Sequence, residues 1–95
     1  MPGVHAIEAS GHTPGHLAVV VGDALLWSGD AFVHPSNVPH PEWASAADMD
    51  PAEGERTRRA LLVRMTQERL LLAGSHLSAI GAVERTDDGF AMIRA

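Results

Sequence analysis

The sequence predicts an α/β (α+β) fold with one mostly antiparallel sheet and one main helix. Three observations predict it: paired apolar runs around Gly22-Asp23, a second pair around Thr86-Asp87-Asp88-Gly89, and a long segment with helical periodicity between them. With 95 residues the chain is long enough for one domain, so residues 1–95 are treated together. Its 45% of hydrophobic residues is typical of a globular protein.

The composition also argues against several classes of function. A net charge of −5 is unfavourable for a nucleic-acid-binding surface, which is usually basic. No apolar run reaches the roughly 18 residues of a membrane span, and the first residues lack the pattern of an export signal. We therefore expect a cytoplasmic protein that binds neither membranes nor nucleic acid. Because there is no cysteine, a metal ion would have to be bound by histidine and carboxylate groups.

Three strands are predicted near the start of the chain. The segment Val4–Ala9 is short and contains two β-branched residues. The runs Leu17–Val21 and Ala24–Ser28 are almost continuously apolar, which predicts strands covered on both faces. Gly22-Asp23 between them is a signal for a two-residue hairpin, and Pro14-Gly15 fits the middle of a type II turn.

A proline-rich loop and a helix follow. Residues Ala31–Met49 contain three prolines that should exclude a regular element, and long loops of this kind are often functional. Asp50 is the expected N-cap, and Glu53 should complete a capping box. The predicted helix runs from Pro51 to Glu68.

The remaining segment predicts one short strand and a final hairpin. The strand, Leu70–Ala73, leads into Gly74-Ser75-His76. The hairpin pairs Ala79–Arg85 with Phe90–Ile93.

Three candidate metal ligands each follow a predicted strand: His12, Asp30 and His76. Polar side chains just beyond strand ends gather at one edge of a sheet and are held there by the strands behind them. Two imidazoles and a carboxylate form a ligand set for zinc, iron or manganese. Glycine stands directly before His12 and Asp30 and two places before His76, which allows close backbone approach.

Other interpretations of the histidines stay open at this point. The closely spaced His12 and His16 fit either a metal site or a turn without a chemical role. His16 is most simply a residue that supports a ligand or stabilises the turn. His34, in the proline-rich loop, is a possible pocket residue but more often such a residue is a solvated one. Trp43 is equally well explained as the wall of a substrate pocket or as an anchor of the loop.

Several motifs together resemble a known family. The motifs that carry the resemblance are Gly11-His12-Thr13-Pro14-Gly15-His16, Ser28-Gly29-Asp30 and Gly74-Ser75-His76. This pattern is similar to the C-terminal half of metallo-β-lactamase-fold hydrolases, in the branch with lactonase-like and organophosphate-hydrolase-like enzymes. Further positions resemble the same branch over essentially the whole chain: Trp43, Asp50, Thr57 and Arg58.

The resemblance implies a fold, a cofactor and a reaction. The fold would be half of an αβ/βα sandwich, and the cofactor one or two ions of zinc, or of iron or manganese. His12 would ligate one ion, Asp30 would bridge two, and His76 would ligate the other, whereas His16 matches the motif but no ligand position. Hydroxide held by the metal would attack an ester, lactone or phosphoester of a small molecule, with Asp30 as a catalytic residue.

One departure from the family pattern limits these expectations. The string His-x-His-x-Asp-His, which lies upstream in whole enzymes, does not occur in this sequence. We therefore expect a truncated half-domain that is inactive or weakly active by itself, with one apolar side of its sheet exposed. A second copy could cover that side in a homodimer. The alternative is a non-catalytic remnant that binds metal or dimerises.

Overall fold

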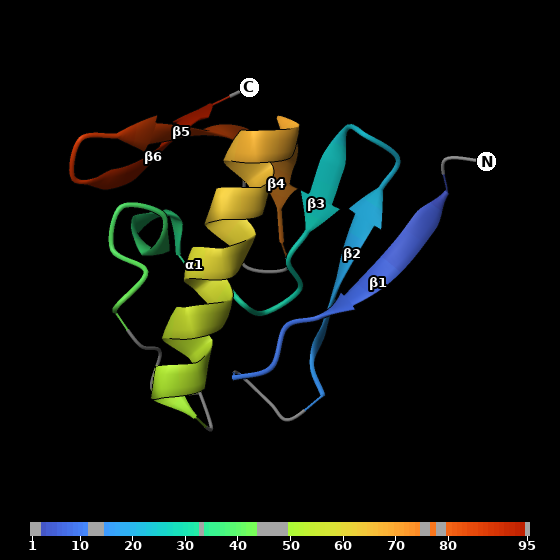
Figure 1. Ribbon diagram of the computed structural model, residues 1–95, viewed down its shortest axis with the longest axis horizontal. Helices are drawn as coiled ribbons and strands as arrows, with labels where there is room; N and C mark the ends of the chain where they lie inside the picture. Colours follow the sequence, from blue (N-terminus) through green and yellow to red (C-terminus); the bar gives the residue numbers. More distant parts are fainter. Residues whose placement is uncertain are drawn as a thin grey trace.

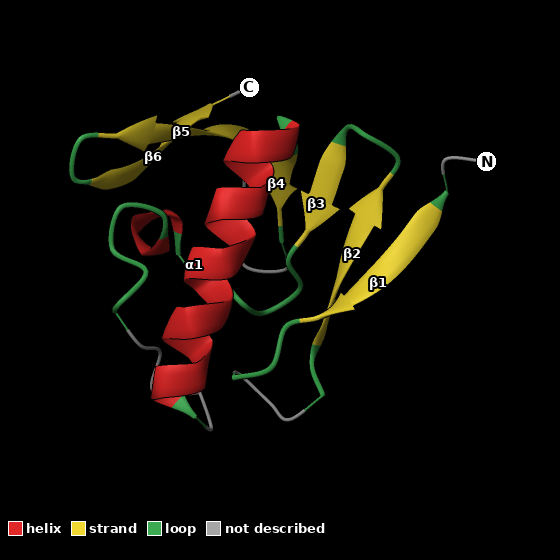
Figure 2. Ribbon diagram, viewed as in Figure 1, coloured by secondary structure: helices red, strands yellow, loops and turns green. Residues whose placement is uncertain are grey.

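The computed structural model describes residues 3–11, 15–32, 34–43, 50–74, 77 and 80–94. Within them one long helix lies against a six-stranded sheet (Figures 1 and 2). No helix in these ranges is long and apolar enough to cross a membrane. The elements are β1 (Val4–Glu8), β2 (Leu17–Val21), β3 (Leu25–Trp27), a 3-10 helix η1 (Pro35–Asn37), α1 (Pro51–Glu68), β4 (Leu71–Ala73), β5 (Gly81–Thr86) and β6 (Gly89–Arg94).

The strands follow one another across the sheet in chain order, from β1 to β6. Neighbouring strands are antiparallel except for β3 and β4, which are parallel because the chain crosses over through α1 between them. The predicted fold, one mostly antiparallel sheet with one main helix, is confirmed.

The helix has the predicted bounds, but its first turn differs in one detail. Asp50 caps the helix, since its Oδ1 accepts a hydrogen bond of 3.0 Å from the Glu53 backbone N–H. The expected capping box is wrong, because the Glu53 carboxylate binds Arg56 instead. The Asp50 N–H that Glu53 would have served donates to the Gly11 carbonyl oxygen at 2.9 Å.

Two connections also differ from the sequence prediction. The turn between β2 and β3 has three residues and not two, because Val21 pairs with Leu25. The proline-rich loop is not wholly irregular, since it contains η1. Proline is compatible with the first position of a helix, where its missing N–H costs nothing, and Pro35 takes that place.

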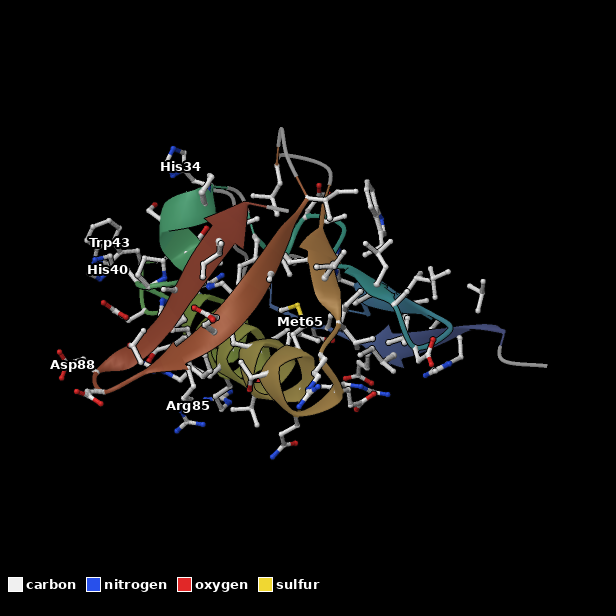
Figure 3. All side chains as sticks on the ribbon, turned by 90° about the horizontal axis from the view of Figure 1, so that it is seen from above. His34, His40, Trp43, Met65, Arg85 and Asp88 are labelled. Atoms are coloured by element: carbon white, nitrogen blue, oxygen red, sulfur yellow. The ribbon has the colours of Figure 1, made fainter. Side chains whose placement is uncertain are left out.

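The hydrophobic core lies between α1 and one face of the sheet. The sheet contributes Val20, Leu26 and Leu72, and α1 contributes Leu62 and Met65, all almost fully buried. Met65 projects from the helix toward the sheet in Figure 3. Burial of each large aliphatic side chain stabilises the fold by about 1.5–3 kcal/mol, so this layer holds the sheet together.

The second face of the sheet is open in the part of the chain that the structure describes. The apolar runs alone predict cover on both faces, and that prediction is wrong, whereas the exposed apolar side expected of a half-domain is confirmed. Exposure alternates along β2, where Val20 is 1% and Val21 is 38% exposed. The strand pairing places one apolar row of the open face across all six strands: Val4, Val21, Leu25, Leu71, Ala82 and Ile93. In the described part of the chain, α1 and the loop before it cover one face of these apolar strands, and the other face is left exposed.

Candidate metal centre

The carboxyl ends of β1, β3 and β4 lie at one edge of the sheet (Figure 1). Asp30 follows β3 at this edge and is partly buried. His12 and His76 lie outside the described residues, but their neighbours Gly11 and Gly74 are described and follow β1 and β4. Among the residues that the structure describes, no group of three histidine or acidic side chains is placed to hold a metal ion.

His16 connects two of the three segments. Its Nδ1 lies 3.1 Å from the Ala9 carbonyl oxygen, just beyond β1, and its Nε2 accepts a hydrogen bond of 3.1 Å from the Asp30 backbone N–H. The Ala9 N–H in turn donates to the His16 carbonyl oxygen at 2.7 Å. The imidazole therefore ties the segment before His12 to the segment that carries Asp30.

Ser28 and Gly74 connect the segment that carries Asp30 to the segment before His76. The Ser28 hydroxyl is fully buried and donates to the Ala73 carbonyl oxygen at 3.1 Å, beside a backbone hydrogen bond of 2.7 Å from the Ser28 N–H to the same oxygen. A Cβ atom on Gly74 would come within 2.5 Å of the Ser28 hydroxyl and 3.2 Å of the Gly29 carbonyl oxygen. Only glycine fits there, so the segment before His76 packs directly on the segment before Asp30.

The first turns of α1 hold the segment before His12. The Thr57 hydroxyl donates to the Ser10 carbonyl oxygen at 2.6 Å. Gly11 lies at φ 136° and packs on the backbone of Gly54, where a Cβ atom would overlap the helix. Thr57 resembles a family position, but its role was not predicted, because its contact with Ser10 is made across 47 positions of the chain and no local pattern reveals it.

Arg58 anchors the proline-rich loop. Its side chain is only 2% exposed. Its Nε donates to the Pro41 carbonyl oxygen at 2.8 Å, and its Nη1 donates to the Ala31 carbonyl oxygen at 3.4 Å. The residue that directly follows Asp30 and the far part of the loop are thereby fixed to the same guanidinium group.

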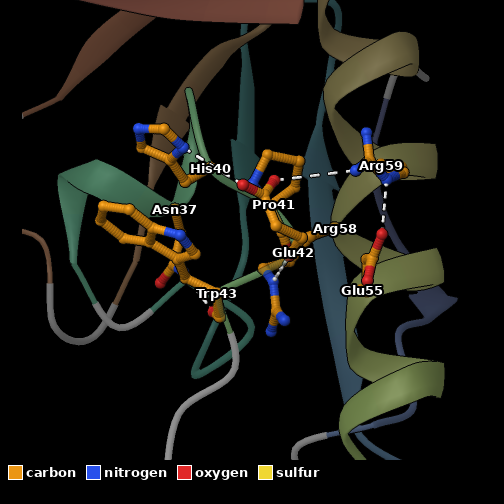
Figure 4. Close-up of polar contacts among 8 residues, drawn as sticks. All are labelled: Asn37, His40, Pro41, Glu42, Trp43, Glu55, Arg58 and Arg59. Carbon is orange, nitrogen blue, oxygen red and sulfur yellow. Dashed lines mark hydrogen bonds and ion pairs between the residues drawn. The ribbon is translucent and has the colours of Figure 1, made fainter.

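His34 and Trp43, the loop residues singled out from the sequence, contact other residues of the loop; Figure 4 shows those around Trp43. His34 caps η1, because its Nδ1 accepts from the Ser36 N–H at 3.1 Å. Trp43 stacks on His40 with ring centroids 3.9 Å apart, and its carbonyl oxygen accepts from the Asn37 side chain. The Trp43 side chain is accessible to solvent, since that residue is 53% exposed. An anchoring role and a pocket role for Trp43 therefore remain compatible.

Charged groups beside this stack form an exposed network. Glu42 contacts His40 at 3.2 Å and Arg59 at 3.7 Å, and Arg59 also binds Glu55 (Figure 4). A hydrogen bond with its own backbone, helped by the interactions with His40 and Arg59, holds the pKa of Glu42 below its usual value against the opposing effect of desolvation. The network favours an ionised Glu42.

The arrangement of sheet and helix is that of a known fold. Solved structures with this fold are metallo-β-lactamase-fold hydrolases, so the resemblance drawn from the motifs is confirmed at the level of the fold. The chain has the fold of part of such a hydrolase.

Three solved structures illustrate the likeness. AidC, a dizinc quorum-quenching lactonase, aligns with a TM-score of 0.88 and 23% identity over 98% of this chain and 34% of its own. The hydrolase AbOPH of the β-lactamase superfamily aligns with a TM-score of 0.87 and 25% identity over 100% of this chain and 35% of its own. A probable metal-dependent hydrolase from Staphylococcus aureus gives 0.74 and 23% over 100% and 36%.

This chain thus spans about a third of the length of the solved structures it matches. No protein-family model matches it, and no curated protein does either.

Proposed function

We propose that the chain is part of a metal-dependent hydrolase in which His12, Asp30 and His76 bind the metal. The observation that carries the proposal is the convergence of three segments: those next to His12 and His76 are both bonded to or packed on the segment that carries Asp30. The donor set fits the cofactor, because imidazole nitrogens and a carboxylate suit zinc, iron or manganese.

One or two such ions would supply Lewis-acid polarisation of the substrate and a lowered pKa of water. The protein's own part is to hold the ligands at a rigid edge. Ser28 and His16 hold the backbone on both sides of Asp30, and Arg58 fixes the loop that follows it. The substrate class is a small ester, lactone or phosphoester, in line with the lactonase and hydrolase neighbours. We expect little or no activity from these 95 residues by themselves, since they span only a third of those enzymes. A cytoplasmic location remains part of the proposal.

The test is the metal content per chain, measured by elemental analysis after purification without chelator. We expect about one zinc, iron or manganese ion per chain, which is the three-ligand count of a catalytic zinc site. The variant His12→Ala should lose the ion, and the control His34→Ala, at the cap of η1, should retain it. A wild-type chain without metal would contradict the proposal and favour a non-catalytic remnant.

The open face of the sheet supports a second part of the proposal, a homodimer. Six strands spaced ~4.8 Å apart, with an average length of about five residues, give the open face an area of roughly 450 Å². Protruding side chains add to this area. A stable interface buries about 800 Å² per partner, and monomers rarely expose apolar patches larger than a few hundred Å². A second copy related by a two-fold axis would cover both faces with the same residues.

Light scattering coupled to size exclusion tests this association. At tens of micromolar, the measured mass should be twice the 10.1 kDa of one chain. A mass of one chain at that concentration would exclude a homodimer of useful strength.

A further inference from the structure

We propose that His16 is a positioning residue for Asp30, acting as the neutral Nδ1–H tautomer, and that it is not itself a metal ligand. The inference rests on the proposed function for the role of Asp30 as a ligand. It answers why the motif Gly11–His16 contains two histidines when one suffices for binding a metal ion.

The hydrogen bonds of His16 determine its tautomer. The Asp30 backbone N–H can only donate, so the His16 Nε2 that lies 3.1 Å from it must be unprotonated. The Ala9 carbonyl oxygen can only accept, so the His16 Nδ1 at 3.1 Å must carry the proton. Both conditions are met together by one form of the ring, the neutral Nδ1–H tautomer.

The same bonds exclude His16 as a ligand. A metal ion binds the unprotonated ring nitrogen through its lone pair. That lone pair, on Nε2, accepts the Asp30 N–H. Binding a metal through His16 would therefore break the bond to Asp30.

The backbone around Gly29 supports the same role. Gly29 has φ 58°, and a Cβ atom there would lie 2.8 Å from the His16 Nε2. Any other residue at position 29 would push the imidazole away from Asp30, so the glycine and the histidine are needed together.

The consequence is a fixed separation between two segments that carry candidate ligands. His16 spans from the residue after β1 to Asp30, the residue that would supply the carboxylate ligand, with one rigid ring in between. Groups that orient a ligand in this way usually change metal affinity by about tenfold to a hundredfold when they are lost.

Two conservative variants separate the two hydrogen bonds. In His16→Gln the amide oxygen takes the place of Nε2 and can still accept from the Asp30 N–H, but the bond to Ala9 is lost. In His16→Asn the amide nitrogen takes the place of Nδ1 and can still donate to Ala9, but the bond to Asp30 is lost. The pair is matched, because each variant removes one bond and keeps the other.

The first measurements use the metal-free chain. Nitrogen NMR of the wild-type imidazole should show a protonated Nδ1 and an unprotonated Nε2 on His16. Exchange of the Asp30 amide hydrogen should be about fivefold to tenfold faster in His16→Asn than in His16→Gln, since only the former lacks its acceptor. An Nε2–H tautomer, or equal exchange of that amide in the two variants, would overturn the positioning role.

The second measurement is the zinc dissociation constant, obtained by competition with a chromophoric chelator. His16→Asn should weaken zinc binding about tenfold more than His16→Gln. Equal affinities, or a wild-type His16 ring whose nitrogen signals show direct bonding to zinc, would also overturn the inference. A wild-type chain that binds no zinc would overturn the proposed function, and the tautomer and exchange results would still decide the hydrogen-bonding role of His16.

Discussion

The two faces of the sheet have the same kind of side chain and opposite surroundings. Leu26 is fully buried beneath α1, whereas Trp27, the next residue in β3, is 41% exposed on the open face. Val20 and Val21 repeat the contrast in β2. The comparison shows that apolar strand residues alone do not determine whether both faces are buried: among the described residues, one face is covered and the other is not.

The largest effect should come from the covered face. Leu26→Ala leaves a cavity in the layer between β3 and α1 and should reduce the free energy of unfolding by about 2–5 kcal/mol. Val21→Ala removes a partly exposed side chain in the next strand and should cost less than half as much. Urea unfolding of both variants, at a protein concentration low enough to avoid dimers, measures the difference. Equal losses would show that the two faces do not differ in packing.

The open face should respond through association. Trp27→Lys places a charge in the middle of the proposed interface, where its burial without a partner is unfavourable. We expect the dissociation constant of the dimer to rise about a hundredfold, equal to about 2.7 kcal/mol. The control Asp23→Lys also introduces a lysine, but in the exposed turn between β2 and β3, and should leave the dimer intact. Sedimentation over a concentration series distinguishes the two variants.

The position of the proline-rich loop, which lies beside α1, depends on the hydrogen bonds of Arg58. Lysine has no planar guanidinium fork, so Arg58→Lys should leave at least one of the carbonyl groups of Pro41 and Ala31 without its donor. The expected loss is about 1–3 kcal/mol of unfolding free energy. Arg59→Lys, at an exposed ion pair with Glu55, should change stability by less than about 0.5 kcal/mol. Similar results for these neighbouring arginines would contradict the anchoring role.

The smallest effect concerns the end of the covering helix. Asp50→Ala removes the cap of α1 and should cost about 1 kcal/mol in thermal or urea unfolding. Glu53→Ala removes only the exposed pair with Arg56 and should cost about 0.2–0.5 kcal/mol, because no capping box is formed. An equal or larger loss from Glu53→Ala would restore the capping-box interpretation.

The sequence predicted features that depend on neighbouring residues. The bounds of α1 were correct because Asp50 and Pro51 are local start signals. The succession of strands along the chain was predicted because turn residues separate the apolar runs. The fold class followed from those runs and the helical segment, and the family resemblance from the motif residues.

Features that depend on distant residues were missed or wrong. The apolar runs alone predict two covered faces, because an apolar run specifies hydrophobic contact without specifying whether the chain supplies it; only the family resemblance predicts the exposed face. The bonds of Thr57 to Ser10 and of Arg58 to Pro41 join residues 47 and 17 positions apart, and no periodicity encodes them. For His16 the sequence predicts only a general supporting role, because its two hydrogen-bond partners, Ala9 and Asp30, come together with the ring only in the fold.

The parallel pairing of β3 with β4 has a consequence for how the chain folds. The strands β1 to β3 are neighbours in the sequence, and so are β5 and β6, so we expect each group to pair early through local contacts. More than 40 residues separate β3 from β4 in the sequence, so we expect their pairing to be the slow, nonlocal step of folding. Ser28 and Gly74, the residues that hold the candidate metal edge together, belong to this junction. We therefore expect the edge to form when the two groups of strands join, so that a chain with a formed edge has passed this slow step.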